Sequence, residues 1–262
     1  MSTAIGGGDT ATSWGIGVTS VSQYNADLTS ANRCHAPALN RMPRLDLYPL
    51  AKDAPREALA DATVIVVDML RASTTIATAL AAGAECVMPF AEIDETLAAA
   101  QRFGGDRVLR GGEGGGRLLP GFARDTSPAE YTPGRAADRR ILFTTTNGAR
   151  ALQHVREARR VLVGAAINAS AVARAVELDA DVAVLGAGTD GVLAMEDLIA
   201  GGVIIDAMIR RSDGWSLNRS ATAMLEHWQG LRDGVAAGAS LIEVFAADIQ
   251  STDGARNLIS IG

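Results

Sequence analysis

Short apolar runs alternate with longer amphipathic segments over most of the chain. The clearest run is TVIVV at residues 63–67, whose β-branched side chains are typical of a strand buried on both faces. The same pattern predicts further strands at 44–48, 87–90, 107–109, 140–144, 161–163 and 181–185. Between and after the strands it predicts helices at 74–82, 92–103, 148–158, 169–177, 193–210, 217–230 and 232–248.

This alternation predicts an α/β fold of three layers, α/β/α, around a mostly parallel sheet. A division of the same elements into two α/β subdomains fits the pattern as well. The glycines of 111–116 predict a segment without regular structure. Residues 1–43 are rich in Gly, Ser, Thr, Ala and Asn without a sustained period, which predicts a mobile extension before an ordered domain at 44–262.

The charge and the cysteine content disfavour several classes of partner. The 262 residues carry 24 basic and 30 acidic side chains, a net charge of −6, whereas a nucleic-acid surface needs a basic patch. No apolar run approaches the roughly 18 residues that span a bilayer, and a signal-peptide pattern is absent. We therefore expect a cytoplasmic protein without membrane or nucleic-acid partners. The sequence leaves open whether the chain forms a homo-oligomer. Cys34 and Cys86 lie in unlike settings and predict neither a disulfide nor a zinc site.

Polar residues follow four of the predicted strands, at 68–75, 144–148, 164–168 and 186–191. Ligands of a parallel sheet bind beyond the carboxyl ends of its strands, and we expect these four segments to face one edge of one sheet. The helices that follow present unpaired N–H groups and a positive dipole end, which suit a phosphate, while an arginine adds a planar charged fork. The predicted anion-binding residues are Arg71, Ser73, Thr74, Thr145, Thr146, Asn147, Gly148 and Asn168.

Each of these features also has a purely structural interpretation. Ser73 and Asp68 are both suited to capping a helix. Asn147 and Gly148 form a dipeptide that is typical of turns. Acidic residues in the first turn of a helix, such as Glu196, are favoured by the helix dipole without any function. Convergence of the four segments separates the two interpretations, because a binding site needs convergence and caps do not.

Carboxylates supply the second ingredient of the predicted site. Asp68, Glu113, Glu196 and Asp197 are hard oxygen ligands suited to Mg²⁺, which would neutralise their repulsion towards a phosphoester. The candidate catalytic acids and bases are Asp68, Glu113 and Asp197, and their spacing does not separate metal ligands from acid–base groups. The three histidines follow none of the predicted strands, and neither cysteine opens a phosphate loop, which disfavours histidine and cysteine phosphatases.

The segment GAGTDG at 186–191 fits the glycine pattern of dinucleotide-binding loops and lies between a predicted strand and a predicted helix. That fingerprint also requires an acidic residue about 20 positions further on, at the end of the next strand. The nearest candidate is Asp213, which no strand pattern precedes. Dinucleotide binding is therefore disfavoured, and the chain contains no Walker A motif that would indicate an ATP-dependent kinase.

Several motifs, in one order, make the chain similar to the 2-phosphosulfolactate phosphatase family. They are VVDMLRASTTI at 66–76, GE at 112–113, GF at 121–122, SPAEY at 127–131, TTNGARAL at 145–152, NASAVA at 168–173, AGTDG at 187–191 and EDLIAG at 196–201. The resemblance implies an α/β phosphoric monoester hydrolase with Mg²⁺ as cofactor. It further implies hydrolysis of 2-phospho-3-sulfolactate to 3-sulfolactate and phosphate, a step towards coenzyme M.

The chain departs from the family pattern at Gly114, Ala123 and Thr126, where the family usually has an arginine, an acid and an asparagine. Two alternatives follow from these departures. One is a phosphatase of the same fold that acts on another small phospho-hydroxy acid. The other is a non-catalytic module that binds an anion or a nucleotide at the GAGTDG loop.

Overall fold

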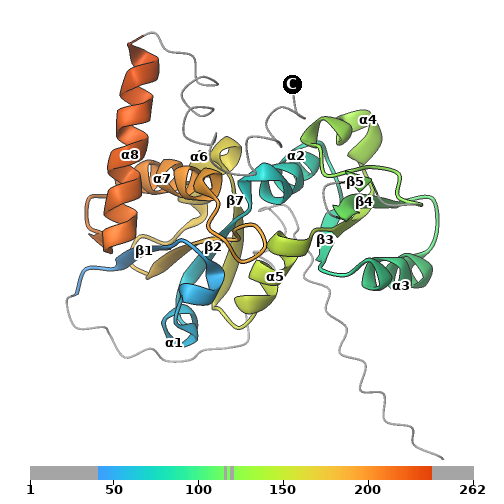
Figure 1. Ribbon diagram of the computed structural model, residues 1–262, viewed down its shortest axis with the longest axis horizontal. Coiled ribbons are helices and arrows are strands. Elements are labelled where there is room, and N and C mark those ends of the chain that lie inside the picture. The colour runs from blue at the N-terminus through green and yellow to red at the C-terminus, as the bar shows by residue number, and fades with distance from the viewer. Residues whose placement is uncertain (1–40, 115–116, 119–120, 238–262) are drawn as a thin grey trace, which may run out of the picture.

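The computed structural model describes residues 41–114, 117–118 and 121–237. The predicted extension at 1–43 lies almost entirely outside the described residues, as does most of the helix predicted at 232–248. The strands form two sheets, one of five strands and one of four. Figure 1 shows the two sheets side by side in the molecule.

The five-stranded sheet is parallel throughout. Its strands are β1 (Arg44–Tyr48), β2 (Thr63–Val67), β7 (Arg160–Gly164), β8 (Val182–Gly186) and β9 (Ser216–Leu217). They lie in the order β7-β2-β8-β1-β9. The β-branched run predicted as a buried strand is β2, and every residue of it is buried. The polar residues after β2 and after β8 therefore leave the sheet from neighbouring strands at the same edge.

The second sheet contains β3 (Cys86–Phe90), β4 (Val108–Gly114), β5 (Arg117–Leu118) and β6 (Arg140–Thr144). The strands lie in the order β3-β6-β4-β5, and only the contact between β4 and β5 is antiparallel. The expectation that all four polar segments follow strands of one sheet is wrong, because β6 belongs to this second sheet. Two sheets that are parallel apart from the β4–β5 pair agree with the prediction of a mostly parallel α/β fold.

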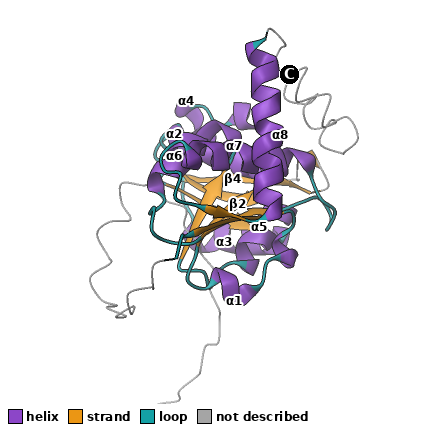
Figure 2. Ribbon diagram, turned by 90° about the vertical axis from the view of Figure 1, so that its left-hand side faces the viewer, coloured by secondary structure: helices purple, strands orange, loops and turns teal. Residues whose placement is uncertain are grey.

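Helices cover both faces of the strands. They are α1 (Arg56–Leu59), α2 (Thr74–Ala81), α3 (Ile93–Phe103), α4 (Pro133–Ala136), α5 (Thr146–His154), α6 (Ala169–Ala175), α7 (Met195–Ile209) and α8 (Arg219–Ala236). Figure 2 shows α2, α6 and α7 on one side of the strands and α1, α3 and α5 on the other. Short helical turns lie at Ala51–Asp53, Met69–Ser73, Pro128–Glu130 and Ala166–Asn168. The predicted three-layer α/β/α arrangement is confirmed.

The alternation of side chains along β2 explains the three layers. Ile65 and Val67 pack into one apolar cluster with residues of α6 and α7, while Val64 and Val66 pack into another with residues of α5. Successive side chains of a strand point to opposite faces, so a strand that is apolar at every position requires a cover on each face. None of the helices in the described ranges is long and apolar enough to cross a membrane.

The expectation that 111–116 has no regular structure is wrong for its first four residues. Strand β4 continues to Gly114, and Gly111 and Gly112 pair with Phe143 and Thr144 of β6. A Cβ atom on Gly111 would lie 2.0 Å from the hydroxyl oxygen of Tyr131, and one on Gly112 would lie 2.3 Å from the Thr144 carbonyl oxygen. Glycine stands here because neighbouring groups approach the strand too closely for any side chain.

The expectation of two late helices is also corrected. Helix α8 runs without a break from Arg219 to Ala236, across the position where the sequence pattern ends one helix and begins the next. Its Gly230 and Gly234 cost helix propensity but do not stop the helix. Helix α8 packs against α7, so tertiary contacts outweigh the local preference.

Candidate functional site

Asp68 lies directly after β2 and is the centre of the candidate site. The turn Met69–Ser73 folds around it: the Asp68 N–H donates to Oγ of Ser73 (2.9 Å), and Oδ1 of Asp68 accepts from the Ala72 N–H (3.2 Å). The side chain is buried. Asp68 thus caps the turn, as the structural interpretation expected, and is at the same time held at the carboxyl edge of the five-stranded sheet.

The second sheet reaches Asp68 through the first turn of α5. Gly148 gives a backbone hydrogen bond to the Asp68 carboxylate, and a Cβ atom on Gly148 would lie 2.8 Å from Oδ2 of Asp68. Thr145, which precedes α5, is buried beside this contact. The carboxyl ends of the two sheets therefore meet at Asp68, where the segments after β2 and β6 come together from different sheets.

The first turn of α7 brings two further carboxylates to the same edge. Oδ1 of Asp197 accepts from the Met69 N–H (2.7 Å) and Oδ2 accepts from the Gly188 N–H (2.9 Å). Glu196 is buried beside it. Four acids from three separate segments of the sequence thus belong to one electrostatic group, because Glu113 and Glu196 act on Asp68, and Asp68 acts on Asp197.

The charges of this group repel one another. Burial raises the pKa of Asp68 to about 6, and the negative charges of Glu113 and Glu196 add to the rise against the hydrogen bonds from Ala72 and Gly148. Burial also raises the pKa of Asp197, as do the charges of Asp68 and Glu196. Negative charges that raise one another's pKa in this way favour a bound cation.

The donor set fits Mg²⁺ by its chemistry. Within residues 41–114, 117–118 and 121–237, no three His, Cys, Asp or Glu side chains gather closely enough to hold a metal ion between them. Mg²⁺ keeps several of its water ligands and usually takes only one or two carboxylates from a protein. A cation held by Asp68 and one neighbour, with water between it and the other acids, would relieve the repulsion that raises the pKa of Asp68.

The predicted anion-binding residues divide into two groups. Three of them use their polar atoms in local turns: Ser73 Oγ donates to the Val66 carbonyl (3.4 Å), Thr74 Oγ1 donates to the Met69 carbonyl (2.6 Å), and the Asn168 amide bonds Ala165 and Val163 (2.8 and 3.0 Å). These contacts build the turns that follow β2 and β7. They explain the residue types without any ligand.

The other group lies around the first turn of α5 and the turn after β2. Thr146 begins α5, and Oδ1 of Asn147 accepts from the Asp190 N–H (3.3 Å), which ties α5 to the loop after β8. Arg71 is half-buried, and no ion pair among the described residues involves its guanidinium group. Arg71 and the N-terminus of α5 are therefore the candidates that are still available to an anion.

The glycines of the GAGTDG loop are explained by packing. A Cβ atom on Gly186 would lie 2.5 Å from the Pro49 carbonyl oxygen, and one on Gly188, whose φ is +68°, would lie 2.5 Å from the Val192 carbonyl oxygen. Helix α7 begins only at Met195, so the third glycine of the motif precedes the helix by several residues. The loop lacks the tight strand-to-helix turn on which a dinucleotide pyrophosphate rests.

The sequence did not reveal which backbone groups complete the site. The N–H groups of Ala72, Gly148, Met69 and Gly188 hold the two buried aspartates. Backbone donors carry no residue-type signal, and their positions depend on how two sheets approach each other. The only sequence signal was indirect, in the small residues at Ala72 and Gly148.

Comparisons of the sequence with known proteins identify the family of the chain. The sequence profile of the 2-phosphosulpholactate phosphatase family matches residues 48–244. The probable 2-phosphosulfolactate phosphatase of Symbiobacterium thermophilum is 44% identical over 59% of this chain and 66% of its own length. That of Clostridium acetobutylicum is 38% identical over 68% of this chain and 76% of its own length. That of Synechococcus sp. is 39% identical over 72% of this chain and 80% of its own length. The chain therefore belongs to the 2-phosphosulpholactate phosphatase family.

Proposed function

We propose that this chain is a Mg²⁺-dependent phosphatase that hydrolyses 2-phospho-3-sulfolactate to 3-sulfolactate and phosphate. The observation that carries the proposal is the meeting of Asp68 and the N-terminus of α5 at the junction of the two sheets, where the charges of Glu113 and Glu196 act on Asp68. The names of the relatives, which denote a phosphoric monoester hydrolase, support the same reaction. In the family this reaction is a step towards coenzyme M.

In this proposal Asp68 would hold Mg²⁺ together with one neighbouring carboxylate, Glu196, and Glu113 would face the ion through water. Bound there, the ion would stabilise the charge that develops on the phosphoryl oxygens. Buried Asp68 is fixed by backbone hydrogen bonds, whereas Glu113 is only half-buried at the end of β4. Glu113 is therefore the carboxylate that solvent reaches, and we assign it the role of accepting a proton from the attacking water.

The anion of the substrate is held by the chain's own positive groups. The first turn of α5 presents backbone N–H groups and the positive end of its dipole beside Asp68. Arg71 lies in the turn that surrounds Asp68 and offers a planar fork for a phosphate or a sulfonate. A substrate with two anionic groups can thus be held at two points, which orients its phosphorus for attack.

A second substrate remains a candidate because the departures from the family pattern lie next to the site. The segment that contains Ala123 and Thr126 runs alongside β4: the Gly112 N–H donates to the Arg124 carbonyl (3.1 Å), and the Ala123 N–H donates to the Arg110 carbonyl (3.0 Å). Strand β4 carries Glu113 at its end. Changes in this segment favour a phosphatase of the same fold that takes another small phospho-hydroxy acid.

The test is release of inorganic phosphate from 2-phospho-3-sulfolactate, measured with Mg²⁺ and with excess EDTA. The proposal expects release that depends on Mg²⁺ and is restored when the ion is added back. A panel of phospholactate, phosphoglycolate and phosphoglycerates without a sulfonate separates the two substrates. Faster turnover of one of these would support the second candidate. No release from any ester, together with a melting temperature raised by the same ligands, would favour the non-catalytic module.

A further inference from the structure

Asp197 differs from the other acids of the site in what its carboxylate does. Both of its oxygens accept short hydrogen bonds from backbone N–H groups, at 2.7 Å from Met69 and 2.9 Å from Gly188. The side chain is 4% exposed. The two donors belong to different loops, one after β2 and the other after β8. A single carboxylate therefore links the exits of two adjacent strands.

The two strand exits are the ones that shape the site. Strands β2 and β8 are hydrogen-bonded neighbours, and the Ala187 N–H extends their pairing to the Val67 carbonyl (2.8 Å). Met69 immediately follows Asp68, so a bond to its N–H fixes the peptide that carries the central acid. Beneath the loop, a Cβ atom on Gly186 would lie 3.5 Å from the Cβ of Asp197, so the side chain is closely packed against the end of β8.

The hydrogen bonds of Asp68 are of another kind. Its bond from Ala72 comes from four residues further along the same turn, and its contact with Gly148 crosses to the second sheet. Glu113 acts on Asp68 from that second sheet. Asp68 thus lies at the junction of the sheets, where a ligand can meet groups from both. Asp197 lies in the first turn of α7, and both of its donors lie in loops that follow strands of the five-stranded sheet.

We propose that Asp197 is a positioning residue that holds the loops after β2 and β8 so that the Asp68 carboxylate faces the N-terminus of α5. It then contacts neither the metal ion nor the substrate, although the sequence pattern had placed it among the metal ligands and catalytic acids. The expected effect of Asp197 on turnover rests on the proposed function. Its structural part, a carboxylate that holds two remote backbone groups, is independent of that function.

Three substitutions of Asp197 separate a positioning role from metal ligation. Asp197→Asn keeps one carbonyl oxygen as an acceptor, Asp197→Ala keeps none, and Asp197→Glu adds a methylene where Gly186 leaves little room. A positioning role predicts that kcat falls least for Asn, by about 10- to 100-fold, and further for Ala and Glu, because small displacements of a reacting group have effects of that size. KM for the ester should change by less than about threefold.

A metal ligand would give the opposite order. The variant Asp197→Glu would retain most of the activity. In Asp197→Asn and Asp197→Ala, kcat would fall equally and the half-saturating Mg²⁺ concentration would rise more than about tenfold, because both lose the charge that binds the ion. That result would overturn the proposal, and so would an unchanged kcat in both Asn and Ala. The matched control is Asp206→Asn, which removes another buried acid from the same helix and should leave kcat unchanged at temperatures below its unfolding transition.

A second measurement does not depend on catalysis. Amide hydrogen exchange at Met69 and Gly188 should accelerate at least about tenfold in Asp197→Ala, relative to the wild type and to Asp206→Asn. Unchanged exchange at both amides would overturn the proposal whatever the kinetics show. If the wild type releases no phosphate but both amides respond, the positioning role stands and the proposed function fails.

Discussion

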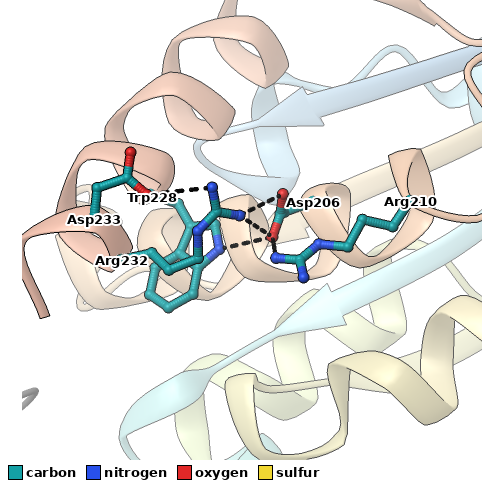
Figure 3. A network of polar contacts seen from close by, with 5 residues as sticks. All are labelled: Asp206, Arg210, Trp228, Arg232 and Asp233. Carbon is teal, nitrogen blue, oxygen red and sulfur yellow. Dashed lines mark hydrogen bonds and ion pairs between the residues drawn. The ribbon is translucent and has the colours of Figure 1, made fainter. Parts of the chain in front are cut away.

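Helix α7 carries buried acids near both of its ends, and their surroundings differ sharply. Near its C-terminus, Asp206 accepts hydrogen bonds from Arg210, which follows α7 directly, and from Trp228 and Arg232 of α8 (Figure 3). Burial works against the charge of Asp206, but the hydrogen bonds from Arg210 and Trp228 and the charges of the arginines outweigh it and lower the pKa. At the N-terminal end, Asp197 lies among acids and backbone N–H groups, and its pKa is raised by burial and by the charges of Asp68 and Glu196.

The two acids are similarly inaccessible to solvent, and they differ in their partners. Asp206 is 5% exposed and Asp197 is 4% exposed. An acid that is paired with cations has its charge satisfied within the protein, so it fastens α8 to α7 and leaves nothing for a ligand. Acids that face other acids repel one another, and a proton or an external cation relieves this repulsion. In this fold, buried acids that repel one another are therefore better candidates for a cation site than an acid paired with arginines.

The largest effect should follow from replacing Asp68, the acid at the junction of the sheets. Asp68→Asn keeps the size of the side chain but removes the charge that would bind Mg²⁺, so we expect kcat to fall about 10²- to 10⁴-fold. The free energy of unfolding without Mg²⁺ should change by less than about 1 kcal/mol, because relief of repulsion offsets a weakened backbone hydrogen bond. Phosphate release and denaturant titration measure the two quantities, and unchanged turnover would remove Asp68 from the mechanism.

The next effect concerns the contact between the two sheets. Gly148→Ala places a methyl group 2.8 Å from Oδ2 of Asp68 and 3.1 Å from the Cβ of Ala72, so the first turn of α5 must move away. We expect kcat to fall about 10- to 100-fold, as for other small displacements of catalytic groups. Crystallography of the variant should show a wider gap between Asp68 and α5. Full activity would mean that α5 does not orient the site.

Most of the fold could be predicted from local patterns. The fully apolar β2 and the alternation of strands with helices indicate a parallel sheet covered on both faces, and the structure has that arrangement. The errors arise where tertiary contacts decide. Gly111 and Gly112 continue β4 because the Tyr131 hydroxyl and the backbone of β6 leave no room for side chains. Local preference cannot register a neighbour that is distant in the sequence.

The candidate site was predictable in its residue types but not in its geometry. Strand exits rich in polar residues identify Asp68, Gly148 and Asp197 as members of one region. The sequence could not show that Gly148 reaches Asp68 from a second sheet, or that both oxygens of Asp197 are bonded to backbone N–H groups. The sequence also could not show that Asp206 is a structural residue, because only the positions of Arg210 and Arg232 distinguish it from a site residue.

Replacing Asp206 tests the structural half of the comparison. Asp206→Asn removes the charge that two arginines share, so we expect the free energy of unfolding to fall by about 1–3 kcal/mol while kcat stays unchanged. The lowered pKa also fixes the dependence on pH: the stabilisation is complete above the ordinary carboxyl pKa of roughly 3.9 and is lost as the pH falls towards the lower pKa of the folded state. The stability difference between wild type and variant should therefore shrink below about pH 4. A difference independent of pH would show that the ionised form of Asp206 does not fasten the helices.

The smallest effect separates the general cost of glycine in a helix from the special need for it at the site. Gly230 lies inside α8, and a Cβ atom there would meet nothing within 4 Å. Gly230→Ala should therefore raise the free energy of unfolding by about 0.5–1 kcal/mol through helix propensity alone, with kcat unchanged. It is the control for Gly148→Ala, because both substitutions add the same methyl group to a helix and only one places it against Asp68. If both variants lost activity equally, the loss in Gly148→Ala could not be assigned to Asp68, and the contact between the two sheets would lose its place in the mechanism.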